Sequence, residues 1–266
     1  MVIKYLTAIS PKLYTTSSKR DVLSISMFKK DYGIILACDV STLQEAETLA
    51  RLSLRFKEIV GYKIGFSLGL RFGLHEVTET LKKINPLSVI YDHQKAGTDI
   101  PQMGEPFARC CKEAGIDGVI VFAQAGPKTL ESFISSIFEH GMTPIVGGLM
   151  THPGFLVSDG GYIIDDAPRQ IYQTALNKGV SYFVLPANKP DLLQTYSKIL
   201  SVRPGISAIM PGIGVQGGDL ETAFRACNGL KPYAIIGSAI YKASDPVVAT
   251  ESFIDSLNAY VMSLKK

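Results

Sequence analysis

The segment from Tyr91 to Pro101, YDHQKAGTDIP, places two carboxylates and one ammonium group within a few residues. Its charged members are Asp92, Lys95 and Asp99. Neighbouring acids and amines keep one another charged, and a fixed ammonium can stabilise negative charge that develops on a substrate. A structural alternative is a solvated turn between a strand and a helix, in which Asp99 caps the helix that Pro101 opens.

Two further charged residues lie in or at the end of apolar segments. Lys63 is in the middle of YKIGF, residues 62–66, and a functional role is favoured because an unpaired lysine is seldom buried. Asp39 follows the apolar start of GIILACDV, residues 33–40. It could belong to the same site, or it could simply cap a helix that begins near Ser41.

The elements that must position these residues alternate along the chain. Apolar strand patterns are separated by amphipathic helix patterns with short connections. Strands are predicted at 33–40, 62–66, 87–91, 117–123, 144–150, 181–187, 206–214 and 233–240. Helices are predicted from 41 to about 54, up to 84, and over 101–114, 127–140, 168–178, 189–200, 220–226 and 247–264.

Eight strands and eight helices in strict alternation predict an α/β fold, a single (β/α)8 TIM barrel with a parallel eight-stranded core. A doubly wound sheet is the alternative. We assign residues 33–266 to the barrel and residues 1–32 to an N-terminal lead-in, which could form an extra helix that plugs the lower end. The longest irregular segment, 151–164, favours a functional role for that loop.

Composition narrows the class of protein. The chain has 266 residues, of which 46% are hydrophobic and 19% charged, as in a globular enzyme. Its net charge of +3 is not concentrated in a Lys/Arg block, which argues against a nucleic-acid or anionic-membrane partner. No segment approaches a membrane span or a secretory leader. Without a Cys-x-x-Cys pair, we expect free thiols and a cytoplasmic location; the cysteines are Cys38, Cys110, Cys111 and Cys227.

Strand ends of such a barrel meet at one rim, where polar residues converge. The residues expected there are Asp39, Lys63, Asp92, Lys95, Asp99, Thr151, His152, Gln216 and Ser238. Two glycine-rich turns, PGIGVQGGD at 211–219 and GSAIY at 237–241, follow the seventh and eighth strands. Their backbone N–H groups are suited to binding phosphate.

These motifs resemble the orotidine 5'-monophosphate decarboxylase family over nearly the whole chain after Gly33. The matching residues are Asp39, Lys63, Asp92, Lys95, Asp99-Ile100-Pro101 and the loop from Pro211 to Asp219. The segment Thr151-His152-Pro153-Gly154 is similar to the family's Ser-His-Pro-Gly segment at the pyrimidine. The resemblance implies cofactor-free, metal-free decarboxylation of orotidine 5'-monophosphate to uridine 5'-monophosphate in pyrimidine biosynthesis.

The resemblance also implies roles for individual residues. Lys95 would stabilise and protonate the C6 carbanion, Asp92 would lie against the substrate carboxylate, and Lys63 would bridge Asp92 and the ribose. Asp99 would reach the site of a neighbouring subunit, which implies a homodimer. The substrate-binding residues would be Asp39 for the ribose, Thr151 for the pyrimidine, and Pro211, Gln216, Gly217, Gly237 and Ser238 around the phosphate.

The chain departs from the family pattern at several positions. Asp92, Lys95 and Asp99 are three and four residues apart, where the family has two and three, so a bulge or early strand end must follow Asp92. Ser238 replaces a phosphate-binding arginine, and Lys242 could substitute for it. Met103 stands where a threonine is frequent, and Phe122 where a histidine is frequent.

Two other functions fit parts of the pattern. A magnesium-dependent sugar-phosphate decarboxylase or aldolase needs an acidic ligand near the end of the second strand, where this chain has Ile64, Gly65 and Phe66. A catalytically silent nucleotide-binding barrel would not need both lysines and three aspartates. His75, His93 and His140 are scattered along the sequence, so we predict no zinc site, and we expect His152 to be a packing residue.

Overall fold

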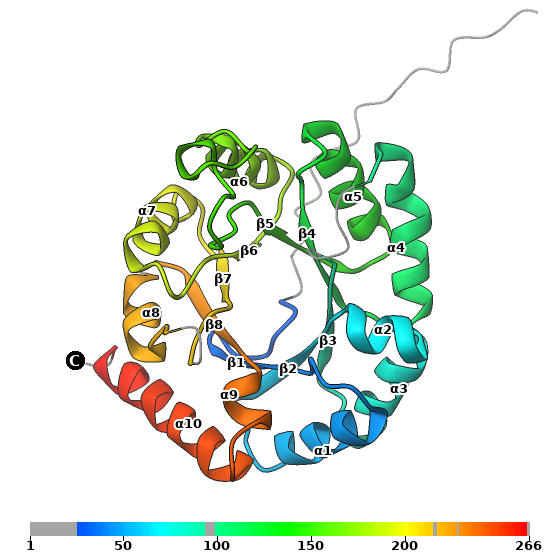
Figure 1. The fold of residues 1–266 in the computed structure, drawn as a ribbon, viewed down its shortest axis with the longest axis vertical. Coiled ribbons are helices and arrows are strands. Elements are labelled where there is room, and N and C mark those ends of the chain that lie inside the picture. The colour runs from blue at the N-terminus through cyan, green and yellow to red at the C-terminus, as the bar shows by residue number, and fades with distance from the viewer. Residues whose placement is uncertain (1–25, 94–98, 215–216, 228, 265–266) are drawn as a thin grey trace, which may run out of the picture.

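Eight parallel strands close into a barrel in chain order, and β1 pairs with both β2 and β8 (Figure 1). The computed structural model describes residues 26–93, 99–214, 217–227 and 229–264. The strands are β1 Gly33–Ala37, β2 Ile59–Ile64, β3 Ser88–Asp92, β4 Gly118–Phe122, β5 Thr143–Gly147, β6 Tyr182–Val184, β7 Ser207–Met210 and β8 Lys231–Ile236. The predicted (β/α)8 fold is confirmed.

Helices form an outer ring around this barrel (Figure 1). They are α1 Leu43–Ser53, α2 Phe66–Phe72, α3 Leu74–Ile84, α4 Gly104–Glu113, α5 Pro127–Glu139, α6 Ala167–Asn177, α7 Pro190–Leu200, α8 Leu220–Ala226, α9 Ser238–Tyr241 and α10 Pro246–Ser263. Short 3-10 turns occur at η2 Pro101–Met103 and η3 Val157–Asp159. None of the helices within these described ranges is both long and apolar enough to cross a membrane.

The strands are buried on both faces, which explains their continuous apolar sequences. Ile35, Ile90 and Ile120 belong to a cluster inside the barrel. Leu36 and Val89, one residue away along their strands, belong to the layer between barrel and helices. Successive strand residues therefore serve two different cores, and only inward positions near the strand ends can line a site.

The predicted bounds of two elements differ from those in the structure. The helix predicted to end at residue 84 is two helices, α2 and α3, divided at Gly73, whose φ of 79° ends the first one. The strand predicted over 233–240 stops at Ile236, and Ser238–Tyr241 forms α9 instead. The apolar spacing of this short segment did not distinguish a strand from one helical turn.

Residues 26–32 plug the lower end of the barrel, at the amino ends of the strands. Phe28 is 3% exposed and packs against the rings of Tyr182 and Tyr233. The main chain of Met27 accepts a hydrogen bond from Ser88 Oγ and donates one to the Tyr182 hydroxyl. A Cβ on Gly61 would lie 3.0 Å from the Phe28 ring, so the absence of a side chain at Gly61 leaves space for this ring. This segment consists of bends and not of a helix; the division of the chain at residue 32 stays a prediction.

Replacing Phe28 with alanine should lower the free energy of unfolding by about 3 kcal/mol, because a buried aromatic ring leaves a cavity under the barrel. Urea unfolding of the full chain measures this. Lys29→Ala, an exposed neighbour in the same segment, should change stability by less than about 0.5 kcal/mol. Equal effects of the two substitutions would contradict the assigned role of the plug.

Candidate active site

A cavity of about 300 Å³ opens at the carboxyl ends of the strands, and we call it the site cavity. Its apolar floor includes Ile120, Val184 and Ile235. Its polar and glycine lining consists of Asp39, Lys63, Asp92, Thr151, His152, Asn188, Gly212, Gly237, Ser238 and Tyr241. The cavity thus occupies the rim where this fold carries its active sites.

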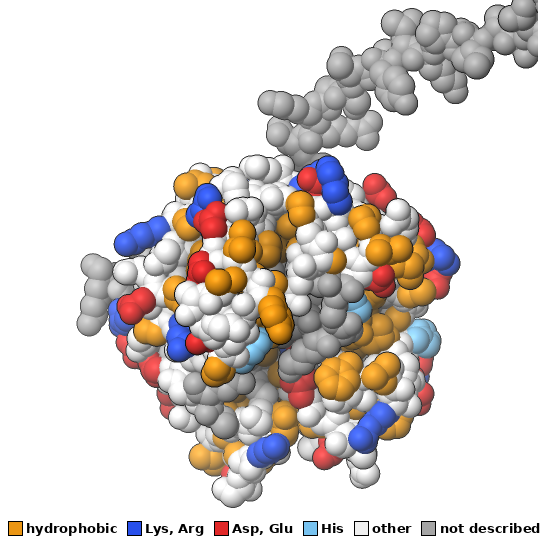
Figure 2. All heavy atoms as spheres, turned by 45° about the horizontal axis from the view of Figure 1, so that its top comes forward, with side chains coloured by type: hydrophobic (Ala, Val, Ile, Leu, Met, Phe, Trp, Pro, Cys, Tyr) orange, Lys and Arg blue, Asp and Glu red, His pale blue; other side chains and the backbone are white. Residues whose placement is uncertain are grey.

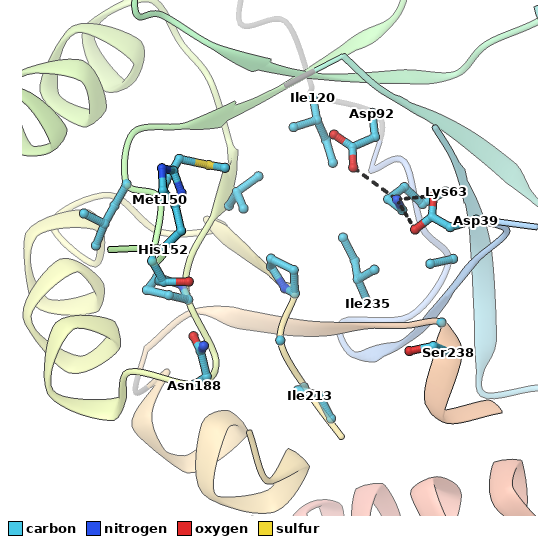
Figure 3. Close-up of a pocket in the computed structure, with 18 of the residues that line it drawn as sticks. Asp39, Lys63, Asp92, Ile120, Met150, His152, Asn188, Ile213, Ile235 and Ser238 are labelled. Carbon is cyan, nitrogen blue, oxygen red and sulfur yellow. Dashed lines mark hydrogen bonds and ion pairs between the residues drawn. The ribbon is translucent and has the colours of Figure 1, made fainter. Parts of the chain in front are cut away.

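Lys63 lies between two carboxylates on one side of the site cavity (Figure 3). Its Nζ donates to both carboxylate oxygens of Asp39, at 2.9 and 2.8 Å, and to Asp92 Oδ2 at 3.1 Å. The side chains of Lys63 and Asp92 are only 5% and 4% exposed, whereas that of Asp39 is 38% exposed. The three residues form one ion-pair network whose outer member faces solvent.

Neighbouring strands bring this network together. Lys63 on β2 pairs in register with Ala37 on β1 and Ile90 on β3, so its inward side chain lies between the ends of both strands. Asp39 and Asp92 follow those partners by two residues and so face the same way. A Cβ on Gly65 would lie 2.9 Å from Asp39 Oδ1, which explains why a glycine follows β2.

The surrounding charges keep Lys63 protonated. Burial lowers the pKa of the Lys63 ammonium, but the charges of Asp92 and Asp39 more than offset burial and raise the pKa above its usual value of 10.5. Burial also raises the pKa of the adjacent Cys38 thiol to about 12, so that thiol stays neutral. The site therefore presents a fixed cation and no reactive thiolate from Cys38.

Most of the predicted site residues within the described ranges do line the site cavity. Those brought together are Asp39, Lys63, Asp92, Thr151, Pro211, Gly237 and Ser238, with His152 beside them. Lys95 and Gln216 lie outside the described residues. Gly217 is described, with φ of 85°, but it does not line the cavity.

Neither Asp39 nor Asp99 caps a helix, as the structural alternatives had it, and the proposed solvated turn falls on residues 94–98, outside the described ranges. Thr42, not Asp39, caps α1, in a capping box with Glu45. The Asp99 carboxylate accepts a hydrogen bond from the Ile100 N–H at 2.8 Å, but neither η2 nor α4 has a side-chain cap. Asp99 is exposed and lines a small cavity beside His93, and it does not line the site cavity.

His93, the residue after Asp92, lies in different surroundings from Asp92. β3 ends at Asp92, in agreement with the early strand end that the spacing required. His93 packs against Phe107 at 4.3 Å between ring centroids, and its buried Nδ1 has no hydrogen-bond partner among the described residues. Burial lowers the pKa of His93, while Asp92 and Asp99 act in the opposite direction. Asp92 and His93 therefore face different parts of the structure.

Sequence reasoning missed two polar residues of the site cavity. Asn188 follows β6 and faces the cavity near His152 (Figure 3). Its position between a strand end and the proline that opens α7 could have signalled it. Tyr241 ends the glycine-rich segment 237–241, in which only the glycine and serine were singled out. Burial and the charge of Asp39 raise the pKa of its hydroxyl.

Around Ser238 the cavity is lined by backbone and neutral groups. Gly212, Gly237 and Ser238 lie there, and Gly212 and Gly214 have φ values of 95° and 85° that favour glycine. Within the described ranges, Lys63 is the one lysine or arginine that lines the cavity. Lys242 is exposed and does not line it, and its substitution for the arginine stays a prediction.

Comparison with known proteins agrees with this geometry. The model of the Orotidine 5'-phosphate decarboxylase / HUMPS family matches residues 33–253. The chain belongs to this family. The Orotidine 5'-phosphate decarboxylase of Methanosarcina barkeri is 31% identical over 231 residues, which cover 87% of this chain and 97% of that protein.

Other members of the decarboxylase family give the same picture. The relative of that name from Methanosarcina mazei is 30% identical and covers 85% of this chain and 95% of its own length. Among solved structures, the orotidine 5'-monophosphate decarboxylase of Methanocaldococcus jannaschii, complexed with inhibitor BMP, has a TM-score of 0.74 and 25% identity. It covers 85% of this chain and 98% of its own. The likeness thus extends over the whole barrel.

Replacing Lys63 with methionine should lower the free energy of unfolding by about 3 kcal/mol, because it removes the ammonium from beside a buried carboxylate. Urea unfolding at neutral pH measures the change. The double variant Lys63→Met/Asp92→Leu should recover much of this loss, and the exposed Lys83→Met should cost less than about 0.5 kcal/mol. A Lys63 variant as stable as wild type would contradict the network.

The stability gained from Lys63 should depend on pH in one direction. Because its folded pKa is raised above 10.5, this stability is fully present below pH 10.5 and is lost as pH rises through the folded pKa. The difference in free energy of unfolding between wild type and Lys63→Met should therefore be constant at neutral pH and shrink in strongly alkaline solution. A difference that grows with pH would contradict the assignment.

Proposed function

We propose that this chain decarboxylates orotidine 5'-monophosphate to uridine 5'-monophosphate, a step of pyrimidine biosynthesis. Membership of the family and curated relatives of that name support the proposal. The observation that carries it is the buried Asp39–Lys63–Asp92 network at the ends of β1, β2 and β3. An anion-binding module would not require two carboxylates at the centre of its site.

The reaction needs protein charge in place of an electron-accepting cofactor. Loss of CO₂ from C6 leaves an sp² carbanion, which a preorganised cation in a water-poor cavity can stabilise. We assign this stabilisation and the proton donated to C6 to Lys95. Asp92, held by Lys63, would lie against the substrate carboxylate. Repulsion between the two carboxylates would destabilise the bound substrate and so favour loss of CO₂.

The remaining cavity residues would bind the rest of the nucleotide. Asp39 is the more exposed carboxylate, and it would accept hydrogen bonds from the ribose hydroxyls. Thr151 would contact the pyrimidine. The phosphate would lie against Pro211, Gly237 and Ser238 of the cavity lining, with Gln216 and Gly217 reaching it from the adjoining loop, so that neutral hydrogen bonds replace a charged arginine fork. Binding of the distant phosphate can still contribute energy that is used in the transition state.

Wild-type protein should consume orotidylate in the presence of EDTA, and Lys95→Ala should lower kcat by at least about 1,000-fold because the cation at C6 is lost. The fall in orotidylate absorbance measures both. Lys128→Ala, an exposed lysine, is the matched control and should retain activity. Turnover that requires a divalent cation would favour the sugar-phosphate enzymes, and tight uridylate binding without turnover would favour a silent barrel.

We also propose that the protein acts as a homodimer with Asp99 shared across the interface. Asp99 is exposed and does not line the site cavity of its own chain, so it is available to a second copy. Large apolar side chains are exposed on the segments that follow the neighbouring strands β2 and β3, namely on α2 and around η2. They are Phe66, Leu70, Ile100 and Met103, of which Leu70 is 82% exposed.

Mixing two inactive variants tests the shared site. Lys95→Ala and Asp99→Ala should each lose activity, and subunit exchange between them should restore about a quarter of wild-type activity, since half of the dimers then hold one complete site. Sedimentation would confirm the dimer. Failure of the mixture to recover activity, with dimers formed, would contradict the sharing of Asp99.

A cytoplasmic location and the absence of nucleic-acid partners remain part of the proposal. Cys38, Cys110, Cys111 and Cys227 are all free thiols, as expected in a reducing compartment. Figure 2 shows charged side chains of both signs interspersed over one face of the molecule, with no large patch of a single sign. Such a face favours a small-molecule substrate over a polyanion.

A further inference from the structure

Phe122, the last residue of β4, stands between the site cavity and a second hollow. That hollow has a volume of about 200 Å³ and lies between β4, the loop after β5, α5 and α6. We call it the side chamber, and its walls include Leu130, Phe155, Ile163 and Ile171, with Gln124 and Gln170. Of the described residues, Phe122 alone lines both the site cavity and the side chamber. Its ring is therefore the partition between them.

The position of this ring is built into the barrel. A Cβ on Gly147, the register partner of Phe122 on β5, would lie 2.2 Å from Cε2 and Cζ of the ring. Only glycine leaves that space, so β5 is shaped to receive the ring at the rim. Phe122 is 7% exposed, and it also borders the small cavity beside Asp99. The partition is thus a buried side chain that is packed against β5.

The side chamber is suited to an uncharged, mostly apolar group. No lysine, arginine, aspartate, glutamate or histidine is among its described lining residues, and its polar groups are amides and one hydroxyl, that of Thr174. An apolar cavity of about 150 Å³ can hold a benzene molecule, so this chamber could hold a small substituent of a ligand. It could not hold a second phosphate, for lack of a cation.

The geometry relates the partition to one edge of the pyrimidine. If C6 faces Asp92, as the proposed function requires, the neighbouring strand β4 lies next along the ring. Ile120 is the register partner of Asp92 and lies beside it (Figure 3), and Phe122 is two residues farther toward the rim on the same face. C6 has two ring neighbours, N1 and C5. N1 carries the ribose, which the proposed function places at Asp39 after β1, so C5 is the neighbour on the side of β4.

We propose that Phe122 is a specificity-determining residue that restricts the site to pyrimidine nucleotides without a bulky group at C5. The inference rests on the proposed function and adds the part of the substrate that this chain rejects. Removal of the ring joins the site cavity to the side chamber, so a rod-shaped apolar group at C5 can then enter the chamber. The hydrophobic ring of Phe122 discriminates between nucleotides by the size of their C5 substituent. Because the side chamber lies behind the ring, one substitution at Phe122 should remove this discrimination.

Binding of two probes tests the proposal: uridine 5'-monophosphate and its 5-(1-propynyl) derivative, each titrated by calorimetry. Wild type should bind the propynyl nucleotide at least about 10-fold more weakly than uridylate. Phe122→Ala should shift this ratio by at least about 10-fold toward the propynyl nucleotide, and Phe122→Leu should shift it less. Leu130→Ala is the matched control, because Leu130 lines the side chamber but not the site cavity; it should leave the ratio unchanged.

An unchanged ratio in both Phe122 variants would overturn the proposal, as would an equal shift in Leu130→Ala or tight propynyl binding by wild type. Circular dichroism verifies folding, and Phe122→Leu gives the answer if Phe122→Ala does not fold. Turnover of orotidylate by wild type separates the two levels of inference. If wild type turns over orotidylate but the Phe122 variants leave the ratio of the two affinities unchanged, only the role of Phe122 is overturned. If wild type neither binds uridylate nor turns over orotidylate, the proposed function is overturned as well.

Discussion

A lysine buried between two aspartates is the interaction on which the rest of this site depends. Taking an ammonium and a carboxylate out of water is costly, and the cost is offset only where the groups are close and well oriented. Lys63 meets this condition with three hydrogen bonds at 2.8 to 3.1 Å. The network holds a protonated Lys63 in a fixed position against two aspartates at the rim, and charge that is oriented in advance is what electrostatic catalysis requires.

The barrel separates the residues that hold the fold from those that carry the proposed chemistry. Phe28, Tyr182 and Tyr233 close the lower end with aromatic packing and hydrogen bonds to the main chain. Polar residues gather at the opposite end, where the strands finish. Because the two ends share only the packed interior, the rim can change its loops and ligands while the lower end maintains the closed sheet.

Much of the fold and the charged part of the site could be predicted from sequence. Alternating apolar segments indicated the eight strands, and Lys63 inside one of them stood out as a candidate site residue because a buried lysine needs partners. The strand error at Ser238–Tyr241 arose because four residues carry too little periodicity. Asn188 had only a weak signal, its place between a strand end and the proline that opens α7. The partition at Phe122 could not be predicted, since it depends on how neighbouring strands pack. Gly147 makes room for the Phe122 ring across the sheet, and no local pattern records that contact.

Exchange of the C6 hydrogen of uridine 5'-monophosphate for deuterium, followed by proton NMR in D₂O, tests the central claim most directly. It reports the C6 carbanion itself, without the departure of CO₂. The account predicts that wild type catalyses this exchange and that Lys63→Met, folded and still able to bind uridylate, slows it by at least about 100-fold. Wild-type protein that binds uridylate but leaves the C6 hydrogen in place, or a Lys63→Met variant that exchanges it at the wild-type rate, would contradict the account.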